Sequence, residues 1–252
     1  SEMCIRDSFR MEKAARDEIV KFGKWIFFST ICGFLLFQGD RIILGRVLTL
    51  DHLGIYNIGQ FLATVPGLLG TAIAGRLFIP MYREHPPGDS AANFRTLART
   101  RAAFTGLLMV VAIVLALIGP WLVDALYDSR YHRAGGILVA IACIQMLLII
   151  PLSYETAALA AGDSRAFFVM QSSRALIYFT LVVIGAWLYG LMGLLAAQAI
   201  AQLFCYPVSV WMARRQKAWD PRHDIAATVL AVLGAALALT LHRDVVVAAL
   251  LV

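Results

Sequence analysis

The stretch AAFTGLLMVVAIVLALIGPWLVDAL, Ala102–Leu126, contains a single charged residue, Asp124. A lipid bilayer's hydrocarbon core takes about 20 predominantly apolar residues as an α-helix. The stretch is long enough to cross that core, and it lacks the polar face of a helix that packs on a soluble domain. Its length and composition predict a transmembrane helix.

The composition of the whole chain agrees with this interpretation. Of the 252 residues, 60% are hydrophobic and 15% are charged, whereas a soluble domain is about half apolar and about a quarter charged. The mean hydropathy is +0.76. These values exclude a soluble globular domain, a disordered chain and a disulfide-built scaffold.

Further apolar runs, bounded by charged or turn residues, predict more membrane spans. They are Trp25–Leu48, Leu53–Met81, Gly135–Ala161, Ala166–Tyr189, Leu191–Met212 and Ile225–Leu241. Another run begins near Val245 and reaches Val252 after eight residues, too few to span. The predicted fold class is therefore all-α, a polytopic membrane helix bundle with about seven to eight transmembrane helices.

The loops between these spans differ in charge. One side carries fourteen cations: Arg10, Lys13, Arg16, Lys21, Lys24, Arg83, Arg95, Arg99, Arg101, Arg165, Arg214, Arg215, Lys217 and Arg222. The other side carries four: Arg46, Arg130, Arg133 and Arg243. The positive-inside rule predicts that the first side is cytoplasmic. No basic stretch is interleaved with aromatic residues, so we expect no nucleic-acid partner.

The chain carries no signature of an enzyme or of a metal site. Its cysteines, Cys4, Cys32, Cys143 and Cys205, form no CxxC pair, and its five histidines occur singly. HExxH and GxSxG are absent, and GTAIAGRL at Gly70–Leu77 lacks the Lys and the Ser or Thr of a phosphate-binding loop. We therefore expect a protein that is not an enzyme, without cofactor or metal.

The N-terminal segment divides into two parts. SEMCIRDS, residues 1–8, resembles translated sequencing-adapter sequence, and we expect it to be non-native and the natural protein to extend beyond both ends of this chain. In residues 9–24, Met11, Ala15, Ile19 and Phe22 fall on one helical face. This pattern suits either an interfacial helix on the cytoplasmic surface or a solvated linker helix.

Prolines and regularly spaced small residues occur within the predicted spans. Pro66, Pro151 and Pro207 predict interruptions, which suit a transporter with a moving bundle but also occur as static kinks. Small residues four apart predict closely packed helix faces. These are Gly67, Thr71 and Gly75; Gly193, Ala197 and Ala201; and Ala227, Ala231 and Ala235.

Seven charged residues lie within the bounds of the predicted spans, and two of them, Arg46 and Asp124, are two residues from a span end. The other five lie deeper: Asp40, Arg41, Arg76, Glu155 and Arg174. Each costs roughly 2.5 to 3.5 kcal/mol at a helix centre. For Arg76 and Arg174, near the ends of their spans, snorkelling to headgroups is an alternative. The surplus of arginines over carboxylates suits an anionic ligand such as a phosphate. These five residues are the candidate substrate-binding residues.

The order of several short motifs resembles a known family. They are GDR at Gly39–Arg41, LGIY at Leu53–Tyr56, Arg76 ahead of Pro80, and AGDSR at Ala161–Arg165. Together with the segment Trp25–Pro66 they resemble the second lobe of Wzx-type oligosaccharide flippases, in the multidrug/oligosaccharidyl-lipid/polysaccharide exporter superfamily. The resemblance implies a six-helix second lobe at residues 25–212 and an extra C-terminal helix pair, truncated, at residues 213–252.

This resemblance also implies a function. It is the translocation of an undecaprenyl-pyrophosphate-linked oligosaccharide across the bacterial inner membrane, for lipopolysaccharide or exopolysaccharide, with Arg41, Arg76 and Arg174 meeting the pyrophosphate. The implied partners are that lipid-linked substrate, membrane lipid and a missing N-terminal lobe. A lipid II flippase, a cation-coupled drug antiporter using Asp40 and Glu155, or a membrane polysaccharide polymerase remain alternatives.

The charge pattern makes a testable prediction of topology. The segments Tyr82–Arg101 and Ala213–Asp224 should face the cytoplasm, and His52 and Asp128–Arg133 the periplasm. Single cysteines placed in each segment should react with an impermeant maleimide only at the two periplasmic positions. Labelling of Tyr82–Arg101 from outside the cell would overturn the assignment.

Overall fold

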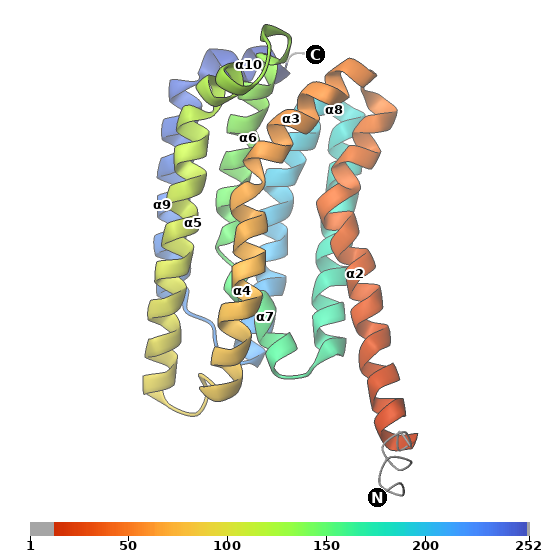
Figure 1. Ribbon diagram of the computed structural model, residues 1–252, viewed down its shortest axis with the longest axis vertical. Coiled ribbons are helices and arrows are strands. Elements are labelled where there is room, and N and C mark those ends of the chain that lie inside the picture. Colours follow the sequence, from red (N-terminus) through yellow and green to blue (C-terminus); the bar gives the residue numbers. More distant parts are fainter. Residues whose placement is uncertain (1–12, 251–252) are drawn as a thin grey trace, which may run out of the picture.

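The computed structural model describes residues 13–250, and all regular structure in this range is helical (Figure 1). The elements are α2 (Lys13–Val47), α3 (Leu50–Ala63), α4 (Val65–Glu84), α5 (Ala91–Leu126), the 3₁₀ turn η2 (Ser129–Tyr131), α6 (Arg133–Ile149), α7 (Leu152–Ala160), α8 (Ser164–Arg215), α9 (Pro221–Leu241) and α10 (Arg243–Leu250). The predicted all-α helix bundle is confirmed for the described part of the chain.

Within residues 13–250, five helices are long and apolar enough to cross a membrane: α2, α4, α5, α8 and α9. The pair α6 and α7, bent by 43°, makes a sixth when it is counted as one span. The outer surface matches a lipid environment, because large apolar side chains such as Trp187 and Leu176 are 85% and 71% exposed. The chain is a multi-pass membrane protein.

Helix α8 contains two of the predicted spans. Its 52 residues turn back at Tyr189 and Gly190, where Gly190 has a φ of 58° that a glycine adopts without strain. Across this turn Tyr178 lies opposite Gln198, and the carbonyl oxygen of Arg174 lies opposite the Cys205 sulfur. In both pairs the two residues are at similar distances in sequence from Gly190, as expected for two antiparallel helices joined by a turn there. The predicted division at residue 190 is therefore correct.

The predicted proline breaks occur at two of three positions. Pro66 lies in the first turn of α4, where a missing N–H breaks no helical hydrogen bond, and Pro151 separates α6 from α7. The third expectation is wrong, because α8 continues through Pro207. The expected loop Tyr82–Arg101 is also mostly helical, since α4 reaches Glu84 and α5 begins at Ala91, with Ser90 as N-cap.

Residues 13–24, predicted as part of an interfacial segment, form the first turns of α2, which continues without a break into the first span. Their interfacial placement stays a prediction, and residues 1–12 lie outside the described residues. The helix pair expected at the C-terminus packs onto the bundle, with α9 against α5 and α6, and α10 against α6.

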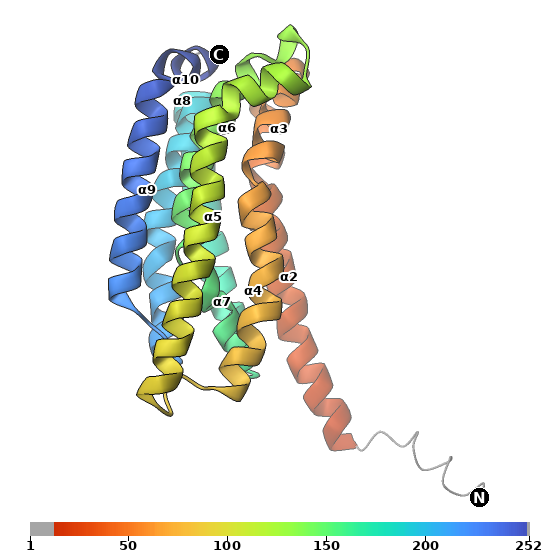
Figure 2. The same ribbon diagram turned by 60° about the vertical axis from the view of Figure 1, so that its left-hand side comes forward.

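The helices alternate in direction, so their connections gather at two ends (Figure 2). Residues 85–90, 161–163 and 216–220 lie at one end, which we call the basic end because Arg83, Arg165 and Arg214 flank them. Residues 48–49, 127–132 and 189–190 lie at the other end. This alternation agrees with the predicted order of spans, while the side of the membrane that each end faces stays a prediction.

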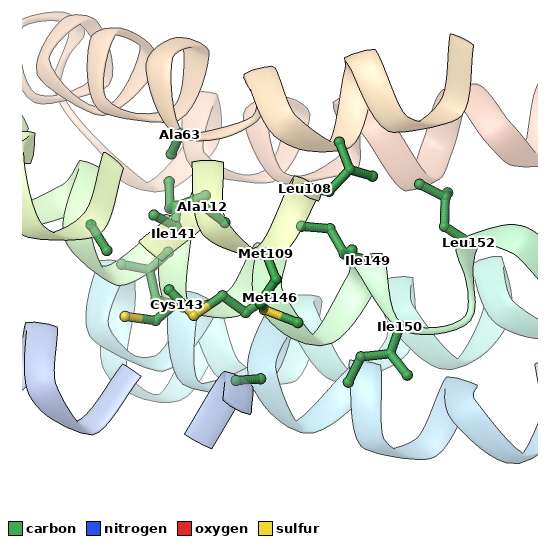
Figure 3. Packing of buried hydrophobic residues seen from close by; sticks show 14 of the residues in the cluster. Ala63, Leu108, Met109, Ala112, Ile141, Cys143, Met146, Ile149, Ile150 and Leu152 are labelled. Carbon is green, nitrogen blue, oxygen red and sulfur yellow. The ribbon is translucent and has the colours of Figure 1, made fainter. Parts of the chain in front are cut away.

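The core lies where α5 and α6 pack together, beside α3 and α9 (Figure 3). Met109 and Ala112 of α5 and Met146 and Ile149 of α6 are fully buried there. Lipid is as apolar as these side chains, so close packing rather than the hydrophobic effect stabilises the contact. The core therefore depends on shape complementarity.

Small residues pack as predicted in two of the three faces. Gly193 lies against Gly185 in the α8 hairpin, and Ala227 and Ala231 of α9 are buried. In the third face the expectation fails at Gly75, because a Cβ there would meet nothing within 4 Å. The small residues Thr71 and Gly75 instead line a cavity.

We predict that Gly193→Ala destabilises the protein. A Cβ at Gly193 would lie 2.0 Å from the carbonyl oxygen of Gly185, so the two halves of α8 must move apart. Such overpacking costs about 1 to 3 kcal/mol. Gly106→Ala in α5 is the control, since its Cβ would meet nothing within 4 Å. Thermal unfolding in detergent should separate the two variants, and equal unfolding temperatures would contradict the hairpin contact.

Candidate functional site

A cavity of about 250 Å³ lies between α2 and α8 on one side and α4, α6 and α7 on the other. Apolar side chains form much of its wall, among them Leu36, Phe37, Ile79, Ile141 and Leu148. Its polar wall comes from two carboxylates, one guanidinium and several amides: Asp40, Glu155, Arg174, Gln60, Gln145, Gln171, Gln198 and Gln202. The cavity thus combines an apolar wall with hydrogen-bonding groups, as small-molecule sites do.

Asp40 of α2 is buried and surrounded by donors from two other helices. The Tyr56 hydroxyl of α3 donates to its carboxylate at 2.5 Å, and the Gln60 amide of α3 donates to the same oxygen. The Gln198 amide of α8 donates to it at 3.3 Å. A buried carboxylate is stable only with such partners, so this group ties α2, α3 and α8 together.

Gln60 also connects Asp40 to Arg41, the next residue of α2. Its amide nitrogen donates to Asp40, while its amide oxygen accepts from Arg41 Nε at 2.6 Å. Arg41 Nη1 donates to Gln38 at 3.0 Å. The two adjacent charges, which lie on different sides of α2, are therefore bridged by one amide. Arg41 is outside the cavity lining, although its partner Gln60 is part of it.

Arg174 of α8 and Glu155 of α7 form an ion pair at the cavity wall. Their side chains are 7% and 18% exposed, so both charges are largely shielded from solvent. Arg174 Nη1 also lies 3.4 Å from the Gln171 oxygen, and its buried Nε has no hydrogen-bond partner among the described residues. Arg174 lines the cavity, but this one donor is enclosed by protein.

The structure thus brings Asp40, Glu155 and Arg174 together in one cavity and leaves Arg41 and Arg76 outside its lining. Arg76 is exposed on α4. The arginine surplus of the sequence consequently does not lie in this cavity, whose charged lining has two carboxylates and one guanidinium. The role of all five residues in binding a substrate stays a prediction.

Sequence reasoning missed the amides, which line the cavity more densely than the charges do. Each of these glutamines lies within an apolar run of the sequence. An uncharged polar side chain in such a run is a weaker indication of a site than an arginine, but it could have been recognised from the sequence. Gln145 and Gln202 make no hydrogen bond within residues 13–250, and the oxygen of Gln145 is buried. The Gln202 amide is therefore available to a ligand in the cavity, whereas the Gln145 oxygen is enclosed against Gly67.

A second polar cluster lies at the basic end. Arg101, counted among the loop cations, is fully buried: its Nε donates to Ser153 at 2.9 Å and its guanidinium lies 4.4 Å from the Tyr154 ring centroid. Tyr154 donates in turn to Asp224 at 2.8 Å. These bonds connect α5, α7 and α9. No group of three or more metal-ligating side chains that could hold an ion occurs in the described part.

Comparison with known proteins assigns the chain to a family. Residues 3–135, more than half of the chain, match a family described as polysaccharide biosynthesis protein. The chain belongs to this family of membrane proteins, as the motifs between Gly39 and Arg165 predicted. Membership of this family indicates a role in polysaccharide biosynthesis or export.

One curated relative is the amylovoran biosynthesis protein AmsL of Erwinia amylovora. It is 23% identical over 210 residues, which cover 80% of this chain and 53% of the relative. The chain thus spans about half the length of this relative. No solved structure matches the chain.

The Arg174–Glu155 pair makes a testable prediction about stability. Glu155→Leu should cost about 3 to 5 kcal/mol, because it leaves a buried guanidinium without its counter-charge. The double variant Glu155→Leu, Arg174→Met should recover much of this loss, since no unpaired charge remains. Unfolding free energies in mixed micelles measure both.

The exposed pair Arg130–Asp51, with side chains 65% and 76% exposed, provides the control. Arg130→Gln should cost less than about 1 kcal/mol, as is usual for surface pairs. A double variant at positions 155 and 174 that is no more stable than Glu155→Leu would mean that Glu155 is not the counter-ion.

Proposed function

We propose that the protein moves a lipid-linked oligosaccharide, carried on undecaprenyl pyrophosphate, across the bacterial inner membrane during polysaccharide biosynthesis. The observation that carries this proposal is the cavity between α2 with α8 and α4 with α6 and α7. Together with the family, it supports a transport role more than a catalytic one.

The cavity wall suits the parts of such a substrate. Sugar hydroxyls both donate and accept hydrogen bonds, and so does the amide of Gln202, which has no other partner in residues 13–250. A phosphate oxygen would compete with Glu155 for the Arg174 guanidinium, which lines the cavity. The apolar wall would contact the prenyl carbons next to the phosphate.

The transporting unit in this proposal includes a further lobe. A rocking mechanism needs two lobes around one site, and this chain spans about half the length of the relative AmsL. In this proposal the first lobe would add a further wall to the cavity, and this wall would supply the additional cations that a pyrophosphate needs.

A second candidate function is cation-coupled drug antiport. The two carboxylates against one guanidinium in the cavity lining favour it, because coupling ions bind to carboxylates. Against it stands the Asp40 carboxylate, which three side-chain donors and the backbone N–H of Arg41 already occupy.

Gln202→Leu tests the proposed function. It removes a cavity amide without breaking a hydrogen bond of the described structure, and it should lower polysaccharide export about tenfold, the effect of one or two lost hydrogen bonds to substrate. Complementation of a strain that lacks this gene, with membrane levels checked by immunoblot, is the measurement.

Gln216→Leu, the same substitution at the C-cap of α8 and outside the cavity, is the control and should export normally. Unchanged export by Gln202→Leu would contradict the proposed cavity role. Normal export combined with altered drug resistance would instead favour the antiporter.

A further inference from the structure

A groove of about 400 Å³ lies on α8 at the basic end, separate from the cavity. Its lining comprises Tyr206, Pro207, Val210, Trp211, Arg214 and Trp219. The first five are spaced so that they share one face of the helix. At a rise of about 1.5 Å per residue, positions 206 to 214 extend over roughly 12 Å. The groove is thus apolar along most of its length and cationic at its Arg214 end, next to the connection at residues 216–220.

Arg214 is held in one orientation on an aromatic platform. Its guanidinium lies 4.0 Å from the ring centroid of Trp219, and the Trp219 indole N–H donates to Asp224 at 3.2 Å. Because that bond fixes the indole, the guanidinium is preorganised rather than freely rotating.

The donors of Arg214 are also unoccupied. Within residues 13–250 its guanidinium makes no hydrogen bond and no ion pair, whereas its neighbour Arg215 pairs with Asp163 at 2.9 Å. The nearby carboxylates are used elsewhere: Asp224 accepts from Tyr154, Tyr206 and Trp219, and Asp220 caps α9. Arg214 therefore carries an uncompensated positive charge beside an apolar groove.

From this geometry we infer that the groove binds an anionic phospholipid of the adjoining leaflet. The phosphate accepts hydrogen bonds from the Arg214 guanidinium, and an acyl chain lies along Pro207, Val210 and Trp211. Charge complementarity selects an anionic lipid over a zwitterionic one, because each cation near an anionic headgroup contributes about 1 kcal/mol. Trp211 is 44% exposed, and tryptophan is a residue type that is enriched at membrane interfaces.

Native mass spectrometry of the full chain in mild detergent tests this site. Phosphatidylglycerol should be retained more than phosphatidylcholine of the same chain length. Arg214→Gln should weaken phosphatidylglycerol binding about fivefold, the effect of one cation, and weaken phosphatidylcholine binding less, because the choline charge already offsets its phosphate. Arg222→Gln, which removes an exposed cation from the same end but outside the groove, is the matched control and should bind as the wild type does.

Equal binding of phosphatidylglycerol by Arg214→Gln and wild type would overturn the proposal. So would an equal loss in both variants, which would mean attraction to the basic end as a whole. A measurement on the wild-type chain covers the case in which Arg214→Gln does not fold. Photoactivatable phosphatidylglycerol should crosslink within residues 206–219, and crosslinks confined to other helices would refute the site.

Discussion

A carboxylate in the low-dielectric interior of a helix bundle is stable only when donors surround it, and Asp40 meets this condition with groups from three helices. Tyr56 and Gln60 approach from α3, Gln198 from the second half of α8, and the backbone N–H of Arg41 from α2 itself. The hairpin of α8 is needed for this arrangement, because only the turn at Gly190 returns Gln198 to the level of Tyr178 and Asp40. The cavity wall on this side therefore depends on Asp40.

A second charge organises the contact between α7 and α8 across the cavity. Arg174 pairs with Glu155, which α7 presents because Pro151 bends the chain by 43° away from α6. A straight helix in place of α6 and α7 would direct position 155 elsewhere. The proline thus positions a counter-ion, which explains why this break occurs at the cavity, while Pro207, exposed on the outer face, leaves α8 continuous.

The polar groups of the bundle divide between two locations. Amides and one ion pair line the cavity, where the Gln202 amide, without a partner in the described residues, remains available to a ligand. At the basic end, Arg101 donates to Ser153 and stacks on Tyr154, and Tyr154 donates to Asp224, so that α5, α7 and α9 are joined, while Arg214 lies exposed on the outer face without a hydrogen-bond partner in the described residues. The cations of the sequence therefore lie in three environments: Arg101 is enclosed in the bundle, Arg174 is paired at the cavity wall and Arg214 is exposed on the outer face. Sequence position alone does not separate them.

The sequence by itself determined the class of protein, the order of the apolar segments, the hairpin division at Gly190 and the presence of charge within the spans at Asp40, Glu155 and Arg174, because length, hydropathy and the cost of charge in lipid are properties of single segments. Only the tertiary structure decided that Arg76 lies outside the cavity, that Arg101 is buried and that glutamines form much of the polar wall. Each of these facts depends on which faces of distant helices meet. That meeting is set by close packing at residues such as Gly193 and by the bend at Pro151, neither of which a local pattern reports.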